Sequence, residues 1–417
     1  MTLTIKDIEV IWLDVPMTEI SDRTMERSYH TWHISEILRV TTDAGLVGYG
    51  ETMPHYTWRK VSPEAIAFAK GKNPADLMWD DTLGAGMQMA CFDLVGKAAG
   101  APVHRLLGKQ VRQWCPLSWW DMDMSPEDYA VQARRAVAAG YTSFKQKARP
   151  WWDINEQVRL TTEATPAHFK LDMDFNETLV NASIAIPVLR RLHKYPNIAL
   201  VESPILQTDI EGMRRVRAMS KIGLALHYTL PLMMGLRSDA YDGFVNYESV
   251  NRQLILAHIA QEANLPFFIQ MVGTAWTTAM ALHLGAVCTH AQWPAVTCLN
   301  IYADQLSTQP IEVRNGYARV PEGPGLGIEF DERALRYRVD KPEKANAEAL
   351  YAFIGPAGER TWYAGEQGPA GYWEDFLRGN QPRFEAGVRL ERWDNDGSPE
   401  WRDLAARAAL APVRSWR

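Results

Sequence analysis

Apolar and polar residues alternate in two segments near the start of the chain, residues 4–15 and 34–50. Such alternation predicts β-strands with one buried face, and Thr42-Asp43-Ala44-Gly45 divides the second segment as a hairpin turn does. From about residue 63 to 107 the apolar residues recur at helical spacing, and Ser62 just before them is a suitable N-cap. The first part of the chain is therefore expected to form an α+β unit.

Beyond about residue 113 the pattern changes to short apolar runs separated by helical stretches such as 125–140 and 252–265. Eight such runs, spaced about 20 to 30 residues apart, indicate repeated βα units and favour a TIM-type barrel over an open sheet. In such a barrel, polar residues at the carboxyl ends of the strands face the active site. The expected strands are 115–120, 143–149, 169–175, 198–204, 223–229, 243–248, 266–272 and 295–301.

The second expected strand carries two lysines, Lys145 and Lys147, separated by one residue. Residues at i and i+2 of a strand point to the same face. If that face is a barrel interior, mutual repulsion and burial lower the pKa values of both lysines, and one of them becomes a usable base near neutral pH. The alternative is a solvated face or a charged edge, where alternating lysines are common.

Acidic residues end the next two expected strands: Asp172 and Asp174, followed by Asn176, and then Glu202. Carboxyl ends of neighbouring barrel strands converge, and oxygen ligands from separate strands are what Mg²⁺ prefers. Either acid alone could instead cap the following helix or pair with a lysine. The series in order favours a metal site.

Together with further segments, this series resembles the enolase superfamily, of the mandelate racemase and muconate lactonizing enzyme type. The resemblance covers roughly residues 4–335 and includes residues 42–51, 93–97, 102–108 and 320–329. It implies an α/β fold: a modified TIM barrel, (β/α)7β, with an α+β N-terminal capping domain. The implied domains are 1–112 for the capping domain, 113–320 for the barrel, and 321–417 for a segment returning to the capping domain plus an extension.

The resemblance also implies a chemistry in which a divalent metal stabilises the enediolate formed when a base removes the proton α to a carboxylate. Lys147 matches the base, and Lys145 would polarise the substrate carboxylate and lower the pKa of its neighbour. Asp174 and Glu202 match two metal ligands. Where the family has an acidic third ligand, this chain has His227 or Tyr228. The family implies Mg²⁺, but an imidazole ligand favours softer ions such as Mn²⁺.

The opposite side of the implied site also departs from the family. Gln270 stands where racemases and many acid-sugar dehydratases have a histidine, and glutamine cannot transfer a proton. Glu248 lies near the position of the aspartate that supports that histidine, and Asn300 replaces a glutamate of the eighth strand. His258 and His283 fall on helix faces, and we expect them to be surface or packed histidines.

Composition limits the kinds of partner that we expect for this protein. The 417 residues carry a formal net charge of -6, without the basic stripe that tracks nucleic acid. The sequence lacks a membrane-spanning run and a signal peptide, so we expect a cytoplasmic protein with no membrane partner. Five tryptophans in residues 336–417 indicate that this tail folds, against the capping domain or against a neighbouring subunit of a homo-oligomer: Trp362, Trp373, Trp393, Trp401 and Trp416.

These features favour a lyase that dehydrates a small hydroxy carboxylic acid such as a sugar acid. Elimination of water needs one base and one acid, and Lys147 with His227, Tyr228 or Glu248 as proton donor would satisfy that need. One alternative is a racemase or epimerase with an unusual second acid. Another is a family member that has lost metal-dependent catalysis and acts as a binding or regulatory protein. Substrate choice is expected to depend on the lid or connection at residues 16–33, on the loop 55–58 and on the barrel loops.

Overall fold

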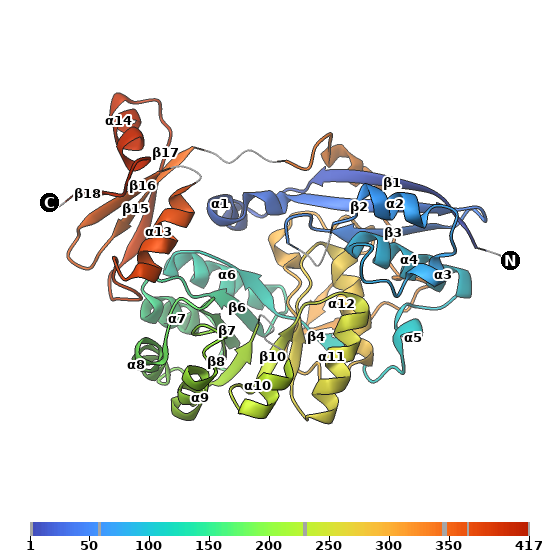
Figure 1. The fold of residues 1–417 in the computed structure, drawn as a ribbon, viewed down its shortest axis with the longest axis horizontal. Helices are drawn as coiled ribbons and strands as arrows, with labels where there is room; N and C mark the ends of the chain where they lie inside the picture. Colours follow the sequence, from blue (N-terminus) through green and yellow to red (C-terminus); the bar gives the residue numbers. More distant parts are fainter. Residues whose placement is uncertain (1–2, 57–59, 228–231, 344–347, 365–366, 416–417) are drawn as a thin grey trace.

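The computed structural model describes residues 3–56, 60–227, 232–343, 348–364 and 367–415. Figure 1 shows three parts, which are an N-terminal capping domain in blue, a barrel from teal to yellow, and a C-terminal extension in red. The capping sheet lies across one end of the barrel, and helix α1 (Glu19–Ser28) lies between that sheet and the extension. No helix among the described residues is both long and apolar enough to cross a bilayer.

The capping domain is built on an antiparallel sheet in the order β14-β1-β2-β3. The predicted hairpin is confirmed, with Gly45 at φ 77° between β2 and β3. Ser62 caps its helix as predicted, since its Oγ accepts from the Ala65 amide at 3.1 Å. The strands are β1 (Ile5–Asp14), β2 (Ile34–Thr42), β3 (Val47–Thr52) and β14 (Arg338–Val339), and the other helices are η1 (His30–His33), α2 (Pro63–Ala69), α3 (Pro74–Leu77), α4 (Ala85–Ala99) and α5 (His104–Leu107).

The barrel holds a seven-stranded parallel sheet in the order β11-β10-β9-β8-β7-β6-β5, so the expected (β/α)7β barrel with a capping domain is confirmed. The strands are β5 (Trp119–Asp121), β6 (Ser143–Lys147), β7 (Lys170–Asp174), β8 (Ile198–Glu202), β9 (Gly223–Leu226), β10 (Gly243–Asn246) and β11 (Phe267–Ile269). The helices are α6 (Pro126–Ala138), α7 (Ile154–Glu163), α8 (Ala182–Leu192), α9 (Ile210–Met219), α10 (Leu232–Ser238), α11 (Val250–Glu262) and α12 (Ala275–Val287).

The first and last expected strands differ from the prediction. The run 115–120 is split, because β4 (Trp114–Pro116) pairs in a separate small sheet with β12 (Val313–Arg314) and β13 (Tyr317–Arg319). The run 295–301 makes only two single parallel bridges, from Ala295 to Leu117 and from Val296 to Gln270, before the turn η2 (Leu299–Ile301). These bridges to both neighbours still close the barrel.

Two buried carboxylates join the capping domain to the rest of the chain. Glu51 accepts hydrogen bonds from the amides of Thr274 and Thr277, at the start of α12, at 2.9–3.0 Å. Asp93 on α4 accepts from the amides of Tyr49 and Leu326 at 3.0 and 2.9 Å. Each carboxylate therefore satisfies backbone donors that would otherwise be buried without a partner.

The extension follows the segment that returns to the capping sheet through η3 (Glu332–Tyr337) and β14. It is an antiparallel sheet in the order β17-β15-β16-β18 with one helix on each side (Figure 1). The tail is folded, as predicted. Among the described residues, β14 pairs with β1 of the capping sheet, Arg392 pairs with Glu26 of α1 at 2.9 Å, and the Phe384 amide donates to the Pro150 carbonyl of the barrel at 2.9 Å. The elements are β15 (Ala349–Ile354), β16 (Arg360–Ala364), α13 (Gln367–Arg378), β17 (Arg389–Asp394), α14 (Pro399–Ala408) and β18 (Val413–Ser415).

Candidate active site

Both lysines of β6 point into the barrel, as their spacing predicted. Lys145 is fully buried, and its Nζ lies 2.6 Å from Glu202 Oε2 and 3.4 Å from Asp174 Oδ2. The Nζ of Lys147 contacts Asp174 Oδ2. The register sets these contacts, because Lys147 is paired with Asp174 across β6 and β7, and Asp174 with Glu202 across β7 and β8. The alternative of a solvated lysine face is therefore wrong.

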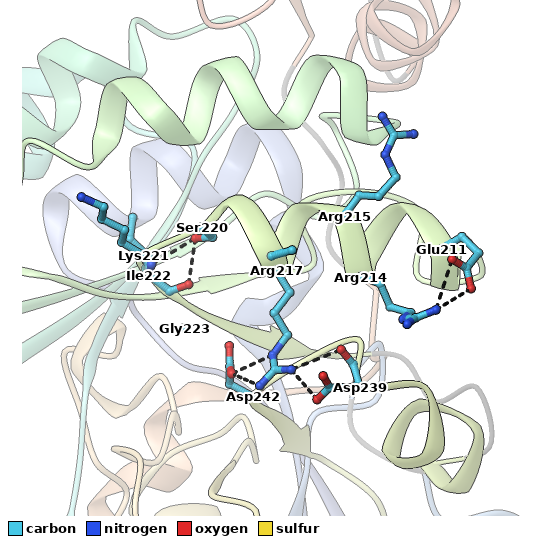
Figure 2. A pocket seen from close by; sticks show the side chains of 11 residues that line it. Glu211, Arg214, Arg215, Arg217, Ser220, Lys221, Ile222, Gly223, Asp239 and Asp242 are labelled. Carbon is cyan, nitrogen blue, oxygen red and sulfur yellow. Dashed lines mark hydrogen bonds and ion pairs between the residues drawn. The ribbon is translucent and has the colours of Figure 1, made fainter.

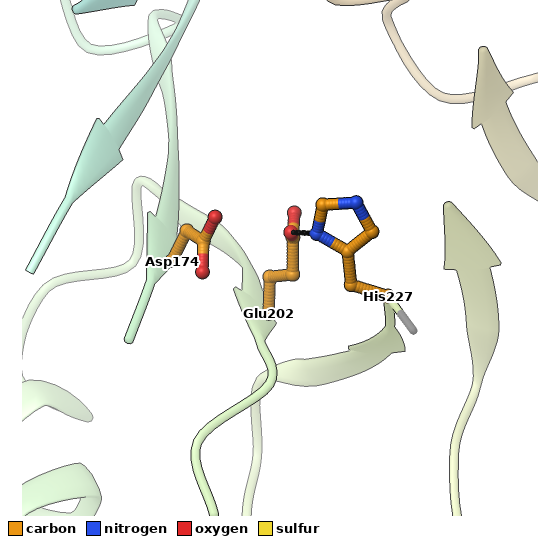
Figure 3. Close-up of side chains that lie close together, drawn as sticks. All are labelled: Asp174, Glu202 and His227. Atoms are coloured by element: carbon orange, nitrogen blue, oxygen red, sulfur yellow. Dashed lines mark ion pairs between the residues drawn. The ribbon is translucent and has the colours of Figure 1, made fainter. Parts of the chain in front are cut away.

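The ends of β7, β8 and β9 bring together Asp174, Glu202 and His227 (Figure 3). All three side chains are buried, and one ligand atom from each lies within 4.8 Å of the others. His227 Nδ1 lies 2.7 Å from Glu202 Oε1. Ligands bound to one ion at about 2.0–2.2 Å lie up to about 4 Å apart, so small side-chain movements suffice. Two carboxylates and an imidazole fit a divalent cation.

The two lysines differ in their pKa values. Burial lowers the pKa of Lys147, and the charges of Lys145 and Arg149 add to this effect against the opposing attraction of Asp174. Burial acts on Lys145 too, but Glu202 and Asp174 outweigh it and raise its pKa. The expectation that both pKa values fall is therefore wrong for Lys145, because its ammonium lies between two carboxylates.

The two aspartates of β7 also differ. The pKa of Asp174 is lowered, since Lys147, Lys145 and His227 together overcome the cost of its burial. Asp172, two residues earlier on β7, is buried without a direct ion pair, and this burial raises its pKa to about 7. Asp174 therefore stays ionised, the state in which a carboxylate can bind a metal ion.

An amide occupies the side of the site opposite Lys147. Gln270 Oε1 accepts from Lys145 Nζ at 2.7 Å, and its Nε2 donates to the Tyr56 hydroxyl and lies 3.3 Å from His227 Nε2. Tyr56 in turn packs on Trp32 with ring centroids 4.7 Å apart. The capping-domain loop at 55–56 therefore reaches the site, as expected of that loop; Thr57 and Trp58 lie outside the described residues.

The remaining predicted site residues have varied placements. Tyr228 lies outside the described residues. Glu248 is half-buried just beyond β10, and in the described part of the chain no ion pair or hydrogen bond joins its carboxylate to the lysines or the triad. The Asn300 side chain bonds the backbone of Trp120, at 3.0 and 2.7 Å. His283 is packed and His258 is exposed, as predicted.

Sequence reasoning missed how the segment 16–33 is fixed. Most of it is helix α1, which is tied to the barrel: Ser21 donates to Asp121 at 2.8 Å, and Arg27 pairs with Asp123 at 2.8 Å. Asp121 and Asp123, two residues apart at the end of a strand, were the available signal. This segment is therefore an anchored helix beside the end of β5.

A surface hollow of about 630 Å³ lies elsewhere, at the amino end of β9 (Figure 2). Arg217 pairs there with Asp242 at 2.9 Å and with Asp239, while Arg214 pairs with Glu211 at 3.1 Å. Catalytic groups of barrel enzymes lie at the carboxyl ends of strands. This hollow is therefore outside the candidate site.

Comparison with known proteins adds an independent finding. Residues 128–334 match the family model described as "Enolase C-terminal domain-like". An N-succinyl-L-Arg/Lys racemase of Bacillus cereus is 25% identical over 353 residues, covering 72% of this chain and 89% of the relative. A D-gluconate dehydratase of Thermoproteus tenax is 26% identical over 391 residues, covering 82% and 75% respectively.

Solved structures agree with this relationship. The crystal structure of a mandelate racemase/muconate lactonizing family protein from Azoarcus sp. EbN1 has a TM-score of 0.66 at 25% identity, covering 82% of this chain and 98% of that one. Residues 128–334, which match the family model, contain both lysines of β6 and the buried triad. The chain belongs to the enolase superfamily, in the mandelate racemase and muconate lactonizing enzyme group.

Proposed function

We propose that this protein is a lyase that removes water from a hydroxy carboxylic acid, such as a sugar acid, with Lys147 as the base. The observation that carries the proposal is the contact of the Lys147 ammonium with Asp174, beside Glu202 and His227. A divalent ion held by these three residues would supply Lewis-acid stabilisation of the charge that develops on the substrate carboxylate. Lys147, with its lowered pKa, takes the α-proton, and Lys145 holds the carboxylate by its charge.

Elimination is favoured over racemisation by the side chain opposite Lys147. A racemase needs a proton-transferring group on each face of the α-carbon, and Gln270 supplies an amide there. Elimination needs one base and one acid, and because His227 is assigned to the metal, Tyr228 and Glu248 are the candidates for the acid. Among the relatives, the D-gluconate dehydratase catalyses a reaction of this class, and the racemase is the relative that supports the alternative.

The histidine in the triad leads to a specific expectation about the metal. An imidazole in place of a carboxylate removes one negative charge and is a softer ligand. Mg²⁺, which the family implies, is therefore expected to bind more weakly than Mn²⁺. His227→Asp, which restores a third carboxylate, should shift the preference toward Mg²⁺.

The test is calorimetric titration of Mn²⁺ and Mg²⁺ into the wild type, Asp174→Asn, His227→Asn and the matched control His258→Gln, whose histidine is exposed on α11. Loss of a metal ligand should weaken Mn²⁺ binding by at least about 100-fold, because loss of a residue that only hydrogen-bonds to a ligand already costs about 10–100-fold. The control should bind as the wild type does. Metal-loaded protein is then screened for dehydration of hydroxy acids, with Lys147→Met expected to be inactive.

If neither Mn²⁺ nor Mg²⁺ binds at millimolar concentration, the proposal is wrong. The search would then turn to ligands that bind without being converted, as expected of a binding or regulatory protein.

A further inference from the structure

Arg149 continues the line of cations that begins with Lys145 and Lys147. The ladder between β6 and β7 extends one residue past the strand, because the Ala148 amide donates to the Asp174 carbonyl at 2.8 Å. Lys145, Lys147 and Arg149 are therefore spaced two residues apart, the first two in β6 and Arg149 just past the last residue that the ladder holds. Same-face neighbours on an extended chain are about 6.6 Å apart, a few carbon–carbon bonds in length.

The Arg149 guanidinium is buried but has few partners. The residue is 4% exposed, and its one side-chain hydrogen bond runs from Nη1 to Asn176 Oδ1 at 2.9 Å. Its Cζ lies 5.4 Å from the centroid of the Trp373 ring, which belongs to the extension. Asn176 and Trp373 thus orient the group and leave four of its five N–H donors without a side-chain acceptor among the described residues.

The other buried cations beside it are all paired. Lys145 and Lys147 contact carboxylates, and Arg27 pairs with Asp123. Within the described ranges, no carboxylate lies within 4.0 Å of Arg149. The nearby Asp123 carboxylate is engaged by Arg27 and by the indole N–H groups of Trp151 and Trp152, at 2.7 and 3.1 Å. A buried charge is normally paired, so Arg149 lacks the anion that its surroundings call for.

We propose that Arg149 binds a second anionic group at the far end of the substrate. The substrate is then a hydroxy acid that carries a second carboxylate or a phosphate at the end remote from the reacting carbon. The proposal rests on the proposed function for one point, that the first carboxylate lies at Lys145 and the triad. A guanidinium held by an amide and an aromatic face suits two parallel hydrogen bonds to a carboxylate or phosphate. Lys145, Lys147 and Arg149 would then address the carboxylate, the α-carbon and the distal anion in order.

The test is binding by calorimetry to the full chain, with and without Mn²⁺, of three acids that share one six-carbon skeleton. Gluconic acid has one anionic end, glucaric acid has a second carboxylate, and 6-phosphogluconic acid has a distal phosphate. The variants are Arg149→Met, which removes the positive charge, and Arg149→Lys, which keeps the charge but lacks the paired N–H donors of the planar guanidinium. The matched control is Arg159→Met, an exposed arginine on α7.

The wild type should bind at least one doubly anionic acid about 10- to 100-fold more tightly than gluconic acid, the range typical of charge-assisted hydrogen bonds. Arg149→Met should abolish that difference without weakening gluconic acid binding, Arg149→Lys should restore part of it, and Arg159→Met should match the wild type. The tighter of the two doubly anionic acids identifies carboxylate or phosphate as the distal group.

Equal binding of all three acids, no binding of any, or a preference that survives in Arg149→Met would overturn the inference. A lower melting temperature in Arg149→Met with the preference intact would make Arg149 a structural contact of Trp373. The two proposals fail separately. A preference for doubly anionic acids without turnover refutes the lyase alone, whereas turnover of gluconic acid that is indifferent to Arg149 refutes the distal site alone.

Discussion

Single side chains decide the charge balance of this site. Lys145 and Lys147 have the same chemistry and neighbouring positions, yet burial beside Glu202 and Asp174 raises the pKa of the first while the pKa of the second is lowered. The difference arises because Lys145 lies between two carboxylates and Lys147 contacts one. Lys145 is thereby held as a cation, whereas Lys147 gives up its proton more readily.

A buried histidine outside the site gives a pH prediction at the same scale. The His283 ring accepts from the His104 amide at 3.2 Å and bonds the Leu326 carbonyl at 3.1 Å, and burial lowers its pKa from 6.5 to about 3. Below pH 6.5 the unfolded chain therefore binds a proton that the folded protein does not. This group should reduce the free energy of unfolding as pH falls from 6.5 to about 3, by up to about 1.4 kcal/mol per pH unit.

Urea denaturation between pH 4 and 7 measures this effect. His283→Gln should show a shallower decline toward low pH than the wild type, whatever its stability at pH 7. His258→Gln, at an exposed position, should keep the slope of the wild type. Identical slopes for His283→Gln and the wild type would contradict the lowered pKa.

At the scale of elements, helix α1 is held from two sides. Ser21 bonds to Asp121 at the end of β5, Arg27 bonds to Asp123 just past it, and Glu26 pairs with Arg392 of β17 at 2.9 Å. The helix is therefore tied both to the barrel and to the extension. Displacement of α1 would break contacts on both sides, so the extension helps to hold this helix in place.

Glu26→Gln tests the contact with the extension. Partly exposed ion pairs stabilise by up to about 1 kcal/mol, so the amides of α1 should exchange with deuterium up to about fivefold faster in this variant. Glu19→Gln changes an exposed glutamate of the same helix that has no ion pair in the described structure, and it should leave exchange unchanged. Equal exchange in the two variants would show that the Arg392 contact does not hold the helix.

At the scale of the whole molecule, buried polar contacts hold the capping domain in position over the barrel. The Glu51 carboxylate accepts from Ser35 Oγ at 2.9 Å within its own domain, and from the Thr274 and Thr277 amides of the barrel. A negative charge at the start of α12 also interacts favourably with the helix dipole. The loop that carries Tyr56 into the site belongs to the same domain, so this docking also positions Tyr56 against Gln270.

Glu51→Ala should therefore destabilise the protein. Two buried amide donors lose their acceptor, each worth about 1–3 kcal/mol, so the free energy of unfolding should fall by about 3 kcal/mol or more. The matched change Glu332→Ala removes a largely exposed partner of Arg39 and should cost less than about 1 kcal/mol. Chemical denaturation of both variants checks this, and a loss below about 1 kcal/mol in Glu51→Ala would refute the docking role.

The sequence alone predicted much of the fold. Alternation at 4–15 and 34–50 predicted the capping strands, and repeated apolar runs predicted the barrel, because strand and helix periods are local properties of the chain. The spacing of Lys145 and Lys147 predicted their shared face, and the strand-end positions of Asp174 and Glu202 made them candidate ligands. The family resemblance added His227 or Tyr228 as the third ligand. Their catalytic and metal-binding roles, with those of Tyr228 and Glu248, stay predictions.

Tertiary structure decided what depends on distances between remote parts of the chain. Residues 295–301 form only bridges, because the chain turns into η2 after pairing once with each neighbour. The pKa shifts of the two lysines are opposite because the Glu202 carboxylate on β8 lies 2.6 Å from Lys145 Nζ. The spacing of residues within β6 could not predict this contact. The indole ring that lies against the Arg149 guanidinium belongs to Trp373, more than 200 residues later in the chain. Local periodicity determines on which face of a strand or helix a side chain lies. The packing of distant segments determines which charged groups lie next to that face.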